Sequence, residues 1–188
     1  MTTTPSTSDF PSNQNAQLAN GYPESFARAV AQLLADEGGY SDNPADPGGA
    51  TRYGISARSF PGVDLSRLTR NQAAALYYRD FWLRYRYGDL EQPVGEKVFN
   101  LAVNMGPYHA ALCLQRALRA CGRPVAEDGI LGPVTMGAAR AVGDPIALLT
   151  ALRSEAAGYY RLLAALGPAR GDPDAVYFLS GWLNRAYQ

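Results

Sequence analysis

Cysteine and histidine are scarce in this sequence, which limits its covalent and metal chemistry. The two cysteines, Cys113 and Cys121, are too few for a disulfide scaffold. One predicted helix would hold them about 12 Å apart, beyond disulfide reach, so we expect free, partly buried thiols unless the helix ends before Cys121. With one histidine and no cysteine pair at ligand spacing, we expect no zinc site, no other metal and no cofactor.

Charge of one sign and long apolar runs are also missing. The 17 basic and 17 acidic residues cancel, so there is no basic field that would indicate a nucleic-acid partner. No apolar run approaches the ~18 residues of a membrane span, and residues 1–20 lack the apolar and positive regions of a secretory signal. We therefore expect a protein made in the cytoplasm without a signal peptide, and no membrane insertion.

The composition that remains is that of a globular protein, with 47% hydrophobic and 18% charged residues in a chain of 188. Residues 1–20 are rich in Ser, Thr, Asn, Gln and Pro and predict a disordered tail. Apolar periodicity and capping residues predict a mainly α fold of about seven helices, with a small β-hairpin or loop between residues 40 and 57. The predicted helices span about 22–36, 69–88, 94–104, 107–120, a short stretch after Pro133, 145–166 and 173–186.

The stretch from Glu37 to Ser56, EGGYSDNPADPGGATRYGIS, is the most informative part of the chain. The first predicted helix places Glu37 at its C-terminal end, where the helix dipole and partial burial would raise the carboxyl pKa. Such a carboxyl is a proton donor at neutral pH. A loop with Asp42 and Asp46 follows, and then a strand-like run from Thr51. Two carboxylates around one bond are the arrangement that hydrolyses glycosides.

A calcium loop is a weaker interpretation of the same stretch. An EF-hand needs oxygen ligands at its positions 1, 3 and 5 and Glu at position 12. Counted from Asp42, position 3 is Pro44 and position 12 is Tyr53, so the pattern fails. No phosphate-binding glycine motif is present either.

The stretch resembles the opening of the glycoside hydrolase 108 family, bacterial and phage N-acetylmuramidases that cleave peptidoglycan. Further segments resemble the family in the same order along about residues 22–187. They are Leu76–Trp82 (LYYRDFW), Val98–Pro107 (VFNLAVNMGP), Leu114–Leu118 (LQRAL) with Asp128–Thr135 (DGILGPVT), and Gly181–Arg185 (GWLNR).

The resemblance implies a lysozyme-like α+β fold and hydrolysis of the β-1,4 bond between N-acetylmuramic acid and N-acetylglucosamine. It assigns the catalytic glutamate to Glu37, whereas Asn100 stands where many members carry Asp. The spacing of Glu37, Asp46 and Thr51 is similar to that of phage-type lysozymes. This implies Glu37 as general acid, Asp46 as the carboxylate that activates water, and Thr51 as the hydroxyl that holds this water.

Other residues have a structural and a functional interpretation. Asp42 is the rival of Asp46 and a candidate substrate ligand, as are Tyr53, Asn104 and Tyr108. Tyr53 would stack on a sugar or pack the hairpin, and Asn104 would bond substrate or cap its helix. We expect Trp82 and Trp182 to pack in the core or between domains, His109 to lie at the surface, and Asp128 to close a structural turn.

The predicted organisation is a lysozyme-like catalytic region at 21–105 and a helical peptidoglycan-binding region at 106–188, packed as one compact unit. The implied partner is the glycan strand of peptidoglycan. The enzyme would act in the periplasm or cell wall after export or release, as an endolysin, a secretion-associated hydrolase or an antibacterial effector. Export machinery or an immunity protein would then be further partners. A non-catalytic peptidoglycan-binding module is the alternative, and it has no need of Glu37.

Overall fold

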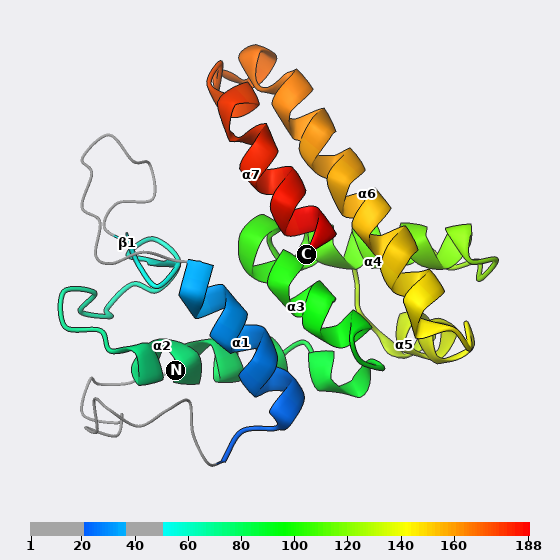
Figure 1. Ribbon diagram of the computed structural model, residues 1–188, viewed down its shortest axis with the longest axis horizontal. Coiled ribbons are helices and arrows are strands. Elements are labelled where there is room, and N and C mark those ends of the chain that lie inside the picture. The colour runs from blue at the N-terminus through cyan, green and yellow to red at the C-terminus, as the bar shows by residue number, and fades with distance from the viewer. Residues whose placement is uncertain (1–20, 37–50) are drawn as a thin grey trace. The chain divides into compact units, whose positions relative to one another are not determined.

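The computed structural model describes residues 21–36 and 51–188, which divide into two compact units (Figure 1). Unit 1 comprises the described residues up to Arg84, and unit 2 spans Tyr85–Gln188. Within the described residues there are seven α-helices and one two-stranded antiparallel sheet. This confirms the predicted fold class, mainly α with a small hairpin. The tail predicted for residues 1–20 lies outside the described residues.

Unit 1 is built around the amphipathic helix α1 (Glu24–Asp36). Its apolar face buries Phe26 and Val30 completely. The Phe26 ring lies 4.8 Å from that of Tyr78 and 5.4 Å from that of Trp82, centroid to centroid. Trp82 is therefore a core residue, as predicted. Aromatic burial of this kind makes a large contribution to the stability of a small core.

The small hairpin predicted between residues 40 and 57 is confirmed at Thr51–Ser56, but the strand-like run expected from Thr51 to Ile55 turns at Tyr53 and Gly54. Strand β1 (Thr51–Arg52) pairs with β2 (Ile55–Ser56), with Thr51 opposite Ser56 and Arg52 opposite Ile55. Tyr53 and Gly54 form the turn, with φ of 53° and 73°. Positive φ at both central residues is the type I′ turn, whose twist matches that of paired strands. The usual Asn-Gly signal is absent because tyrosine occupies the first position.

Helix α2 (Arg70–Tyr77) begins as predicted, because Thr69 and Gln72 form a reciprocal capping box. The expected regular helix as far as Gly88 is wrong. The chain continues as a π-helix, η2 (Tyr78–Leu83), and Arg86 then has a φ of 58°. A left-handed residue cannot continue a right-handed helix. Gly88 lies instead within a short 3₁₀ helix, η3 (Tyr87–Asp89).

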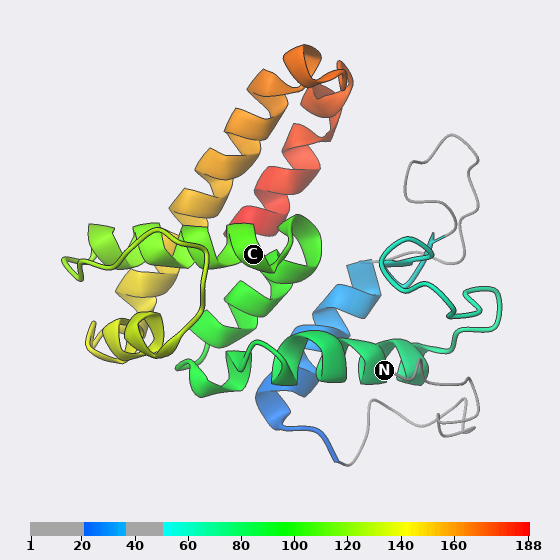
Figure 2. The same cartoon turned by 180° about the vertical axis from the view of Figure 1, so that it is seen from behind.

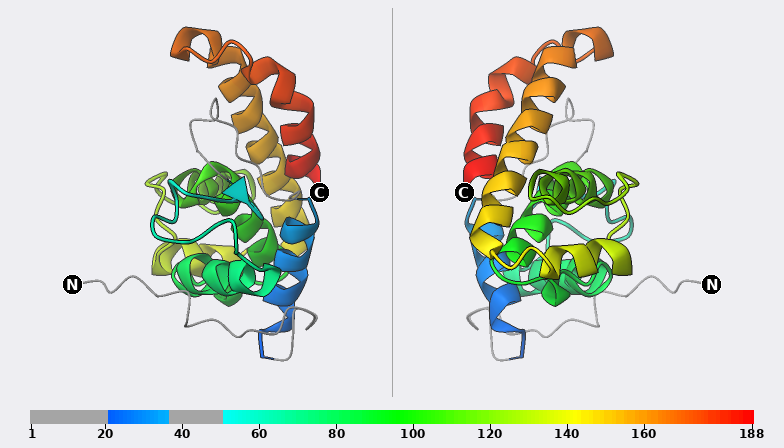
Figure 3. Two further views of the ribbon diagram at one scale, coloured as in Figure 1. Left: turned by 90° about the vertical axis from the view of Figure 1, so that its left-hand side faces the viewer. Right: turned by 90° about the vertical axis from the view of Figure 1, so that its right-hand side faces the viewer.

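Unit 2 is a helical bundle in which α6 (Pro145–Leu166) packs against both α4 (Pro107–Ala120) and α7 (Ala175–Tyr187). Figures 1 and 3 show α6 and α7 side by side, and Figure 2 shows α4 crossing α6. The core centres on Leu114, Leu118 and Leu152, each with no exposed surface. The elements are α3 (Val94–Met105), α4 (Pro107–Ala120), α5 (Pro133–Arg140), α6 (Pro145–Leu166), η4 (Pro168–Arg170) and α7 (Ala175–Tyr187).

The Asp-Pro signal predicts the start of α6 correctly but not the start of α7. The Asp144 carboxylate accepts from the amides of Ile146 and Ala147, as a cap before Pro145 should. The same Asp-Pro signal at Asp172 is wrong, since α7 begins at Ala175. The Asp172 amide donates to the Gly167 carbonyl at 2.9 Å. This turn holds Asp172 beside η4 and delays the helix start.

The C-terminal end of α7 is held by two cations from neighbouring helices. Lys97 of α3 is 6% exposed and donates to the Arg185 carbonyl. Arg153 of α6 donates to the Gln188 carbonyl. Positive charge at the C-terminus of a helix is favourable, because the last carbonyls have no partner within the helix.

Among the residues that the structure describes, no helix has both the length and the apolar character that crossing a membrane requires. The two cysteines are free, Cys113 buried and Cys121 partly exposed, as predicted.

Candidate functional site

Three of the predicted site residues, Glu37, Asp42 and Asp46, lie outside the described residues. Their roles stay predictions. The elements on either side of this segment are described, because α1 runs to Asp36 and β1 begins at Thr51. Unit 1 thus contains both ends of the segment that carries the predicted general acid and its partner carboxylate.

The hairpin that carries Thr51 and Tyr53 is fixed to α2 by one buried phenol. Tyr77 is 1% exposed, and its hydroxyl donates to the Tyr53 carbonyl at 2.9 Å. Ile55, in the facing strand, is fully buried. The hairpin therefore has a defined position in unit 1, and Thr51 is the first residue of its first strand. Sequence reasoning did not find Tyr77, since it interpreted the whole LYYRDFW segment as one amphipathic helix.

Arg52 is a second positioning residue that the sequence analysis missed. Its guanidinium donates to the carbonyls of Leu65 and Ser66 and lies 5.5 Å from the centre of the Tyr53 ring. A guanidinium at this distance makes a cation–π contact. One face of the Tyr53 ring is thus covered by Arg52, so stacking on a sugar would have to use the other face. The sequence feature that could have indicated this contact is the Arg-Tyr-Gly run, in which Arg52 ends a strand and Tyr53 and Gly54 form the turn.

Asn104 and Tyr108 lie in unit 2, on either side of the break between α3 and α4. The Asn104 amide nitrogen donates to the Asn100 carbonyl at 2.8 Å, within its own helix. Tyr108 is 55% exposed and packs against the loop after α4: a Cβ added to Gly129 would lie 2.2 Å from the Tyr108 ring. The structure therefore places Thr51 and Tyr53 in the hairpin of unit 1, and Asn104 and Tyr108 on either side of the break between α3 and α4 in unit 2.

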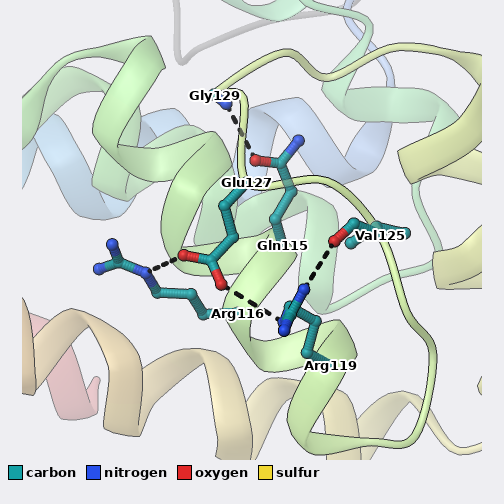
Figure 4. Close-up of polar contacts among 6 residues, drawn as sticks. All are labelled: Gln115, Arg116, Arg119, Val125, Glu127 and Gly129. Atoms are coloured by element: carbon teal, nitrogen blue, oxygen red, sulfur yellow. Dashed lines mark hydrogen bonds and ion pairs between the residues drawn. The ribbon is translucent and has the colours of Figure 1, made fainter.

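The loop that joins α4 to α5 is organised by a buried glutamine. Gln115 is 1% exposed. Its carbonyl oxygen accepts from the Gly129 amide at 2.9 Å (Figure 4), and its amide nitrogen donates to Asp128 Oδ1 at 2.6 Å and to the Ile130 carbonyl at 3.1 Å. Asp128 also accepts from the Ile130 amide. These bonds favour the predicted structural role of Asp128 in closing a turn.

Two carboxyls of this loop are held as anions. The Gln115 amide and the Ile130 N–H lower the pKa of Asp128. The Arg116 guanidinium lowers the pKa of Glu127, to which it donates at 2.9 Å, while Arg119 approaches the other oxygen at 3.4 Å (Figure 4). A general acid needs a raised pKa, so neither carboxyl suits that role.

The remaining ionisable chemistry of unit 2 does not suggest a nucleophile or a metal centre. Burial raises the pKa of the Cys113 thiol to about 12, which keeps it neutral at physiological pH. Within residues 21–36 and 51–188 no group of three or more His, Cys, Asp or Glu side chains could hold a metal ion. His109 is half-buried, and its Nδ1 lies 3.2 Å from the Met105 carbonyl. Trp182 stacks on Tyr160 at 5.7 Å, a packing role as predicted.

Comparison with known proteins gives two family matches and a structural neighbour. Residues 30–106 match the model of glycosyl hydrolase 108, and residues 109–187 match a predicted peptidoglycan domain. The structure of Brucella abortus SagA is similar to this chain, with a TM-score of 0.65 and 25% identity, over 87% of this chain and 94% of that one. No curated protein matches the chain.

These matches support a glycoside hydrolase that acts on peptidoglycan. The first matched segment contains Glu37, Asp46, Thr51 and Tyr53, and the second contains the Gln115-organised loop. Tyr108 lies between the two segments. The chain is thus similar to the glycosyl hydrolase 108 family over residues 30–106 and to the predicted peptidoglycan domain family over residues 109–187.

Proposed function

We propose that the protein is an N-acetylmuramidase, a lysozyme (EC 3.2.1.17) that hydrolyses the β-1,4 bond between N-acetylmuramic acid and N-acetylglucosamine. The observation that carries this proposal is the glycosyl hydrolase 108 match over residues 30–106, followed directly by the peptidoglycan domain match over residues 109–187. All three candidate catalytic residues lie in the first segment.

In this mechanism Glu37 protonates the leaving oxygen and Asp46 activates water, with Thr51 holding that water. The described frame supports Thr51 in this role, because Tyr77 and Arg52 fix its hairpin. We infer an inverting reaction by analogy with phage-type lysozymes. Proton NMR of the anomer first released from a soluble glycan would test this, since a retaining enzyme releases the β-anomer.

The first experiment is mass spectrometry of purified peptidoglycan after digestion with wild type and with Glu37→Gln. Fragments with reducing-end muramic acid from wild type, absent with Glu37→Gln, would support the proposal. Glu24→Gln is the matched control, because the Glu24 side chain in the first turn of α1 is 88% exposed and pairs with Arg28; it should cut at the wild-type rate.

Other outcomes separate the alternatives. Reducing-end glucosamine fragments would move the cut to the other glycan bond. No fragments from wild type, together with binding to sedimented cell wall, would favour the non-catalytic binding module. Asp46→Asn and Asp42→Asn, assayed in parallel, identify the second carboxylate, since losing the general base should lower kcat by about 10²–10⁴.

The biological role is a separate question. We propose action on the cell wall after export or release, by a phage lysis system, a secretion system or an effector pathway. Expression with and without an added export signal tests this: lysis of the host only with the signal would support a wall substrate reached from outside the cytoplasm. Co-expression with a neighbouring gene product that prevents this lysis would identify an immunity protein.

A further inference from the structure

A cavity of about 270 Å³ lies in unit 2, between α4, α6 and η4. None of the predicted catalytic or substrate-binding residues lines it. Helix α4 contributes His109, Cys113 and Arg116, α6 contributes Tyr159, and η4 contributes Arg170. The volume is just below the range for ligand sites, about 300–1,000 Å³. It suits a group of the size of an amino-acid residue.

The charged side chains that line this cavity are both cationic. They are Arg116 and Arg170, and the ring of His109 lies in the same wall. Arg116 uses its Nε to bond Glu127, and its two terminal nitrogens point away from that carboxylate (Figure 4). Arg119 shares the same carboxylate. Glu155 is the other acid whose charge acts on Arg116.

The cavity is lined by two guanidinium groups and by no carboxylate. Arg116 and Arg170 contribute to its wall, whereas no Asp or Glu does, so positive charge is in excess at the cavity. Arg170 is exposed at the end of η4 and lies near enough to influence the Tyr159 hydroxyl. Guanidinium groups bind carboxylates through two parallel hydrogen bonds. The excess charge therefore favours a carboxylate ligand.

The rest of the lining is apolar and hydrogen-bonding. Leu112, Leu162 and Leu163 complete the wall, and Leu162 is 56% exposed at the surface. The His109 ring lies 4.9 Å from that of Tyr159, centroid to centroid. A ligand with one carboxylate and a short aliphatic part, such as an alanine residue, fits this combination. A disaccharide, with many hydroxyls and a larger volume, does not.

We propose that the cavity between α4, α6 and η4 binds a free carboxylate of the peptide stem of peptidoglycan, with Arg170 and Arg116 as its charged ligands. This inference rests on the proposed function, because it assumes a peptidoglycan substrate. It assigns stem recognition to unit 2, while hydrolysis of the glycan belongs to the segment matched at residues 30–106.

The test is calorimetric titration of the full chain with the tetrapeptide stem that an amidase releases from peptidoglycan. Wild type should bind, and Arg170→Gln should weaken binding at least tenfold, with Arg170→Lys intermediate. Arg123→Gln, an exposed arginine in the loop after α4, is the matched control and should bind as wild type does. Leu162→Trp, which narrows the mouth at an exposed position, should also weaken binding.

Three results would overturn the inference: no binding by wild type, equal binding by Arg170→Gln, or equal binding of a stem whose carboxyls have been amidated. A digestion arm separates it from the proposed function. Arg170→Gln should cut stem-free glycan strands at the wild-type rate, but intact peptidoglycan more slowly at low substrate concentration. If wild type cuts neither substrate, the muramidase proposal fails. The calorimetric titration still shows whether the cavity binds the stem carboxylate.

Discussion

Replacement of Gln115 by leucine should destabilise unit 2 strongly, although the two side chains have similar size. Gln115 is 1% exposed and makes its contacts with Asp128, Gly129 and Ile130 in the loop between α4 and α5. Leucine fills the same space but makes none of these bonds. The Gly129 amide then loses its acceptor, and the Ile130 carbonyl keeps only the Thr135 hydroxyl, 3.1 Å away.

The magnitude follows from the number of bonds lost. Each is worth about 0.5–1.5 kcal/mol, and an unmet buried group costs up to about 3 kcal/mol. The apolar gain of a buried leucine offsets part of this, which leaves a loss of about 2–4 kcal/mol. With a urea m-value of about 1–3 kcal/mol/M, the midpoint should fall by roughly 1–2 M.

The assay is urea denaturation followed by tryptophan fluorescence in a Trp82→Phe background. Trp182 lies in unit 2 and Trp82 in unit 1, so the remaining tryptophan reports unfolding of unit 2. Gln188→Leu, at an exposed residue, is the matched control and should stay within about 0.5 kcal/mol of its parent. A loss below about 1 kcal/mol for Gln115→Leu would refute the reasoning, because the bonds would then contribute little to stability.

Three further predictions concern single residues. Burial, with a smaller contribution from Arg153, lowers the pKa of Lys97 to about 8 from its usual 10.5, so the folded state binds this proton less tightly than the unfolded state. The free energy of unfolding of wild type, relative to Lys97→Met, should therefore rise between pH 8 and pH 10.5, by up to about 3 kcal/mol; a flat difference across parallel urea titrations would contradict this. Thr69→Ala removes the capping box of α2 and should cost about 0.5–2 kcal/mol, whereas Thr69→Ser should retain most of the stability in the same denaturation assay. Tyr77→Phe deletes the bond to the Tyr53 carbonyl and should cost about 0.5–1.5 kcal/mol, and it should also lower the rate on peptidoglycan if hairpin position matters; an unchanged melting temperature would argue against the bond.

Two helices of unit 2 could be predicted from the sequence with their bounds. The bounds of α4 and α6 match the prediction, because a break at Gly106 or a cap at Asp144 directly precedes a proline. The start of α7 was not predictable, since the bond between Asp172 and Gly167 depends on how η4 folds back. The hairpin turn was missed because a tyrosine at positive φ has no common sequence signal.

Candidate site residues could be predicted from the sequence, but the residues that hold them in position could not. Thr51 and Tyr53 could be named from the EGGY stretch and its resemblance. Tyr77 and Arg52 could not, because their bonds connect segments that sequence patterns treat separately. A glutamine within a helix is usually exposed, and the sequence does not indicate that Gln115 is buried. It is buried because the loop after α4 folds over it and bonds to its side chain. Glu37, Asp42 and Asp46 stay predictions.

The bond from Gly129 to the Gln115 side chain has a consequence for hydrogen exchange. Gly129 lies in a segment without helix or strand, where amides usually exchange within seconds to minutes. Its acceptor, however, belongs to the buried face of α4. Exchange at Gly129 therefore requires the loop to leave α4, an event that also opens the bundle core. The Gly129 amide should thus exchange as slowly as the amides of α4, although it lies in a loop.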